Sequence, residues 1–103
     1  MRLPSRLKLA EELLNEARKR RVQGLVTYGE FNPETDKRIL SREAIFEAVD
    51  IINYLMFYAA KHRNCFFEDE RGFLKKARQQ VYELFVTLKH LEAIETKRKG
   101  GAS

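Results

Sequence analysis

The chain has 103 residues, with 20 Lys and Arg against 15 Asp and Glu, one cysteine and no tryptophan. A chain of this length forms at most one small domain, whose core is small enough that self-association is expected. The 44% hydrophobic content argues against disorder, and no apolar run reaches the roughly 18 residues of a membrane span. The N-terminal sequence MRLPSRLKLAEELLNE does not resemble a signal peptide, so we expect a cytoplasmic protein without membrane contact.

The net charge of +5 comes from short basic clusters at residues 18–21, 75–78 and 97–99. The sequence contains no helix-turn-helix, zinc finger or aromatic RNA-binding motif that would read a nucleic acid. Two of the clusters fall where helices are expected to end, and cations there complement the helix dipole. We therefore do not expect nucleic acid as a partner.

Three helices are expected in chain order. Apolar residues at three- and four-residue steps predict a helix over 5–22, which Gly24 would end. A loop with two glycines and an Asn-Pro pair follows, and it carries Tyr28 and Phe31. The second helix begins between residues 36 and 41 and ends near Arg63.

The third helix is predicted over residues 68–96, followed by a disordered tail over 97–103. Its apolar residues alternate three- and four-residue steps, as in a two-helix seam: Leu74, Ala77, Val81, Leu84, Leu88 and Leu91. Apolar residues surround most of the second helix, which indicates burial on several sides. These patterns predict a single all-α domain over 1–96, a helical bundle of three main helices completed by formation of a homodimer or homotetramer.

Three acids interrupt the apolar second helix. Glu43, Glu47 and Asp50 follow steps of four and three, so they share one face, which Tyr54 and Lys61 continue. Ionised carboxylates crowded into a buried face would cost on the order of several kcal/mol each unless something compensates them. Either arginine and lysine side chains pair with them and the face is a polar seam or a solvent-facing edge, or a divalent cation compensates them; Mg²⁺ prefers such oxygen ligands.

The segment Glu47-Ala-Val-Asp50, with the apolar run after it, resembles the Glu-x-x-Asp helix of the all-α nucleoside triphosphate pyrophosphohydrolases, the MazG-like superfamily. The preceding YGEFNPETDKR resembles short phage and prophage members. The resemblance covers about residues 28–60. It implies a Mg²⁺-dependent hydrolase that converts a nucleoside triphosphate to the monophosphate and pyrophosphate, with Glu43, Glu47 and Asp50 as catalytic residues.

The family also has an upstream Glu-x-x-Glu, from which this chain departs because Glu12 and Glu16 are four residues apart. Either of these acids completes the metal site of Glu47 and Asp50, or Glu43 does, or the site has decayed. For the substrate, the resemblance suggests phosphate contacts from three basic residues and base stacking by aromatic ones: Arg38, Arg42 and Lys61, then Tyr28, Phe31 and Tyr54.

The histidines and the cysteine are not expected to form a site. His62 and His90 have no partner at metal-ligand spacing, and Cys65, beside two phenylalanines, is expected to be a buried thiol. None of the three is needed for phosphoryl chemistry. The alternative function is a non-catalytic helical oligomerisation or interaction protein on the same scaffold, in which the acids are structural.

Overall fold

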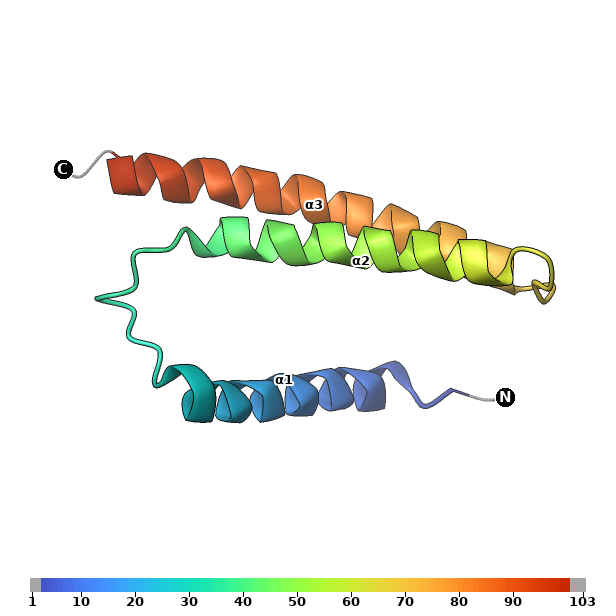
Figure 1. The fold of residues 1–103 in the computed structure, drawn as a ribbon, viewed down its shortest axis with the longest axis horizontal. Coiled ribbons are helices and arrows are strands. Elements are labelled where there is room, and N and C mark those ends of the chain that lie inside the picture. The colour runs from blue at the N-terminus through green and yellow to red at the C-terminus, as the bar shows by residue number, and fades with distance from the viewer. Residues whose placement is uncertain (1–2, 101–103) are drawn as a thin grey trace. The chain divides into compact units, whose positions relative to one another are not determined.

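A computed structural model describes residues 3–100, without the side chains of Thr27 and Tyr28. Within that range it consists of three helices and no strand: α1 (Arg6–Tyr28), α2 (Leu40–His62) and α3 (Glu70–Gly100) (Figure 1). The all-α prediction is confirmed. The chain divides into two compact units, Met1–Lys37 and Arg38–Ser103, which are described separately below.

α1 begins as predicted but ends later. The Ser5 side chain accepts a hydrogen bond from the backbone N–H of Lys8, which caps the first turn. The predicted end at Gly24 is wrong, because the helix continues through this glycine to Tyr28. Gly29 ends it instead: its φ of 80° suits a residue without a side chain, and its N–H donates to the Leu25 carbonyl.

The segment between α1 and α2 is the predicted loop. The Asn32 side chain accepts a hydrogen bond from the N–H of Glu34 at 2.9 Å, and the Asn32 carbonyl accepts from Thr35 and Asp36. This is the turn that an Asn-Pro pair favours. Phe31, at the start of the turn, is 54% exposed.

α2 and α3 form an antiparallel hairpin (Figure 1). On α3, partly or fully buried residues recur at three- and four-residue steps: Leu74, Ala77, Val81, Phe85, Leu88, Glu92 and Glu95. Four of the predicted seam positions pack within the hairpin, whereas Leu84 and Leu91 are 45% and 49% exposed and do not. Two successive four-residue steps after Ala77 place Phe85, and not Leu84, against α2.

α2 is covered on one face only. Ile45 and Ala48 are its buried residues, and Leu74 of α3 completes the buried set in residues 3–100. Large side chains elsewhere on α2 are open, including Phe46 at 54% and Phe57 at 66% exposed. Within the hairpin, the predicted burial on several sides is therefore not found, because α3 reaches only one face of α2.

α3 extends to Gly100, so the disorder predicted from residue 97 is not found over 97–100. Lys97, Arg98 and Lys99 occupy its last turn, where their charges complement the helix dipole. Residues 101–103 of the predicted tail lie outside the described residues. At its other end α3 is preceded by a turn in which Glu70 accepts a hydrogen bond from the Phe67 N–H, as in a capping box.

The start of α2 is capped from α3. Ile39 occupies the N-cap position and has no side-chain oxygen to accept the free backbone N–H groups. The Glu95 side chain supplies the missing acceptor. Its Oε2 accepts a hydrogen bond from the Leu40 N–H at 2.9 Å, and its Oε1 accepts from the N–H of Ser41 at 2.9 Å and from the Ser41 hydroxyl at 2.6 Å. This cap also fixes the register of the two helices.

Replacing Glu95 with alanine should lower the unfolding midpoint by several degrees, because two backbone donors of α2 lose their acceptor. The measurement is thermal unfolding followed by circular dichroism. Glu83→Ala is the matched control, since Glu83 is exposed on α3 and its carboxylate accepts a hydrogen bond from Gln79 of the same helix. Equal losses in the two variants would contradict the capping role.

Candidate functional site

The acidic face consists of Glu43, Glu47 and Asp50. All three side chains are exposed and lie on the side of α2 away from Ile45 and Ala48. Within the described part of the chain, none of them forms a hydrogen bond or ion pair. The structure therefore places these acids together, in water and unpaired.

Because the three acids are exposed, they do not have the desolvation cost expected of buried carboxylates. The compensation expected for buried carboxylates is not required in the single chain, because water hydrates the acidic face. Across residues 3–100, no three side chains of His, Cys, Asp or Glu converge closely enough to hold a metal ion. The acidic face offers oxygen ligands of the kind that Mg²⁺ binds, but these ligands lie in a row along the helix and do not surround one point.

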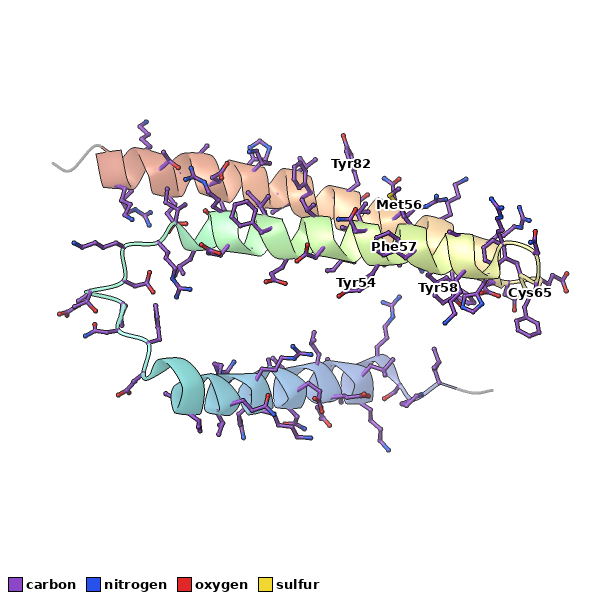
Figure 2. The ribbon with its side chains drawn as sticks, viewed as in Figure 1. Tyr54, Met56, Phe57, Tyr58, Cys65 and Tyr82 are labelled. Carbon is purple, nitrogen blue, oxygen red and sulfur yellow. The ribbon has the colours of Figure 1, made fainter. Side chains whose placement is uncertain are left out.

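Tyr54 and Lys61 continue the acidic face towards the end of α2. Tyr54 is 72% exposed and projects from α2 on the side away from α3 (Figure 2). Lys61 is exposed in the last turn and is in no ion pair in the part of the chain that the structure describes. Both side chains are accessible to a ligand on this face.

Arg42 is engaged elsewhere. Its guanidinium Nε donates to Glu92 Oε2 at 2.9 Å, and Lys89 donates to the other oxygen at 2.8 Å. The two cations, Lys89 first, hold the pKa of Glu92 below its ordinary value. Arg42 would have to leave this pair to bind a phosphate as predicted. Arg38 lies just before α2 and also forms a polar interaction.

The remaining predicted ligands lie in the first unit. Glu16 pairs with Lys19 at 3.2 Å on the exposed surface of α1, and Glu12 is also exposed. The Tyr28 side chain lies outside the described residues. Of the five predicted metal ligands, the three on α2 share one face of that helix without converging on a point.

Comparison with known proteins adds no relative. No protein-family model, no curated protein and no solved structure matches this chain. In the range 3–100, no helix is long and apolar enough to cross a membrane.

The carboxylates with the most contacts were not predicted. Glu92 and Glu95 bind the start of α2 as described above, and the hydroxyl of Ser41, followed by the backbone donors, lowers the pKa of Glu95. One sequence signal marks them: they continue the three- and four-residue spacing of the seam beyond Leu88. An acid in that register lies against the neighbouring helix.

A second carboxylate contact lies at the opposite end of the hairpin. The Tyr58 hydroxyl donates to Glu70 Oε2 at 2.6 Å, which lowers the pKa of Glu70 and raises that of Tyr58. The rings of Tyr58 and His62 are 4.8 Å apart. Cys65, in the connecting turn, is exposed, so the predicted buried thiol is wrong (Figure 2). A turn between two helices has no third element to cover it.

These contacts predict acid sensitivity. Glu70, Glu92 and Glu95 have pKa values below the ordinary 4.5, so the unfolded chain binds protons more readily than the folded one. Their stabilisation is complete above pH 4.5 and is lost as the pH falls through the lowered values. Urea unfolding at pH 7, 5, 4 and 3 should show this decline, and Glu95→Gln should flatten it. An unchanged slope in the variant would contradict the assignment.

Proposed function

We propose that this chain is a Mg²⁺-dependent nucleotide pyrophosphohydrolase of the MazG-like type, which acts on a nucleoside triphosphate. The observation that carries the proposal is the acidic face of α2. It joins three unpaired, exposed carboxylates to an aromatic and a cationic side chain on the same stripe. Its sequence, Glu47-Ala-Val-Asp50, is the part that resembles the superfamily.

The chemistry of the acidic face suits the cation. Glu47 and Asp50 would hold Mg²⁺ with help from Glu43, and an acid of α1, Glu12 or Glu16, remains the alternative source of a further ligand. When bound, Mg²⁺ neutralises the triphosphate and polarises its phosphoryl oxygens. Because carboxylates alone would repel a triphosphate, the face has no affinity for this substrate without the cation.

The reaction on the stripe needs no side-chain nucleophile. The exposed Tyr54 ring, one helical turn beyond Asp50, stacks on a base. Lys61 lies about 16 Å along the helix from Asp50, too far for it to bind phosphates held at that carboxylate. Glu43, when it does not bind the cation, orients a water for attack on the α-phosphorus and accepts its proton, and the bond from that phosphorus to the bridging oxygen breaks as pyrophosphate leaves. Arg42 has no role here while its guanidinium is held by Glu92.

The test is metal-dependent stability together with product release. At a hundredfold excess over its Kd, Mg²⁺ should increase the free energy of unfolding of the wild type by about 2.7 kcal/mol, and the unfolding midpoint should rise accordingly. Glu47→Gln and Asp50→Asn should abolish this shift and the release of pyrophosphate from a panel of nucleotides. Without metal, both variants should stay within about 0.5 kcal/mol of the wild type, since the side chains are exposed.

Glu83→Gln, the same change on an exposed position of α3, is the control and should keep both the shift and the activity. If Mg²⁺ leaves wild-type stability unchanged and no nucleotide is cleaved, the catalytic proposal is wrong.

A second candidate, a non-catalytic oligomerisation protein, is favoured by the outer surface of α3. Phe73, Leu84 and Leu91 lie within about 20° of one another around this helix and are 68%, 45% and 49% exposed. They form an apolar stripe that Gln80 and Thr87 interrupt, and exposed apolar side chains aligned in this way favour an interaction site. A second copy of the chain would supply a matching stripe, which supports a homodimer or homotetramer.

Asparagine at Leu84 and Leu91 should reduce the mass of the assembly measured by light scattering, because both side chains leave the stripe and neither contributes to the hairpin seam. Val81→Asn is the informative contrast: Val81 faces α2, so this variant should unfold the hairpin. A wild-type chain that is monomeric and fully folded at about 100 μM would exclude the stripe as an oligomer interface.

A further inference from the structure

A hollow of about 450 Å³ opens along one side of the hairpin, apart from the acidic face. Its floor is apolar and comes from both helices: Leu55, Met56 and Ala59 of α2 with Leu74 of α3. Met56 is 58% exposed and lies on the side of α2 that borders α3 (Figure 2). On the helix it is about 120° or more from each acid of the acidic face.

The rim of the hollow is cationic. Arg71, Lys75 and Arg78 line it from α3, at spacings of four and three that place them on one face. Along the described chain none of the three lies in an ion pair, whereas Arg42 and Lys89 of the same hairpin both do. The cations extend over about 10 Å of helix, so an extended anion can contact all of them.

One end of the rim is held in place. The Arg71 guanidinium lies 5.2 Å from the centre of the Phe66 ring, within the range of a cation–π contact. Phe66 also lines the hollow. The Glu70 carboxylate, next to Arg71 in sequence, is occupied by Tyr58 and by the Phe67 N–H, and neither Glu68 nor Asp69 forms an ion pair with the rim among the described residues.

We propose that this hollow binds a nucleotide, with its base on the apolar floor and its phosphates along Arg71, Lys75 and Arg78. Cations without acidic partners favour a polyanion, and the apolar floor favours a flat organic group over free phosphate. The volume lies within the range of small-molecule sites. Binding here needs no metal, so the proposal is independent of catalysis at the acidic face.

The test is ATP binding in EDTA, measured by isothermal titration calorimetry on the full chain. Without divalent cations the acidic face cannot bind a nucleotide, so Glu47→Gln should leave the affinity for ATP unchanged. Lys75→Glu and Arg78→Glu should each weaken binding about tenfold or more, the loss that corresponds to 1.4 kcal/mol. Lys76→Glu is the matched control: it makes the same charge change one residue away, outside the hollow, and should weaken binding less than about twofold.

The floor is tested separately with tripolyphosphate, which has the charge without the base. Met56→Gln should weaken ATP binding and leave tripolyphosphate binding unchanged, while Phe57→Gln, on another exposed face of α2, should affect neither. No ATP binding by the wild type in EDTA would overturn the proposal. So would equal effects of Lys75→Glu and Lys76→Glu, or binding to vesicles of anionic phospholipid without any binding of ATP.

Discussion

Two packed helices can cover only one face of each other, and this constraint shapes the hairpin of α2 and α3. The seam buries Ile45, Ala48 and Leu74 and leaves the other faces of both helices in water. A short hairpin with so few buried side chains gains little free energy from apolar burial. The acidic face and the apolar stripe lie where the seam does not reach, and the cationic hollow borders the seam, with Leu74 in its floor.

Polar contacts at both ends compensate for part of this weakness. At one end Glu95 accepts the free donors at the start of α2, and at the other the Tyr58 hydroxyl donates to Glu70 at the start of α3. Apolar seams tolerate sliding by a turn, whereas two carboxylates with fixed partners do not. The end contacts thus fix the axial register of α2 on α3, while burial of Ile45 and Ala48 turns the acidic face away from the seam.

Local patterns in the sequence predicted the helices well, since the Ser5 cap and the apolar periodicities act within one element. The predicted end of α1 at Gly24 was wrong because a glycine weakens a helix without having to end it. The helix ends at Gly29, which has a positive φ. Leu84 and Phe85 could not be separated by spacing, since both fit a seam and the partner helix decides. Helix geometry was enough to predict that the acids share one face. Their exposure depends on how many helices pack against α2, and the spacing of residues within α2 does not give that number.

The net charge of +5 is less informative than its distribution. Within the hairpin, negative charge collects on the face of α2 opposite the seam, and positive charge collects along one side of α3 above an apolar floor. These surfaces attract opposite classes of ligand: hard cations on the first, phosphates on the second. A polyanionic nucleotide therefore needs a metal ion at the acidic face and none at the cationic rim, and removal of divalent cations separates the two.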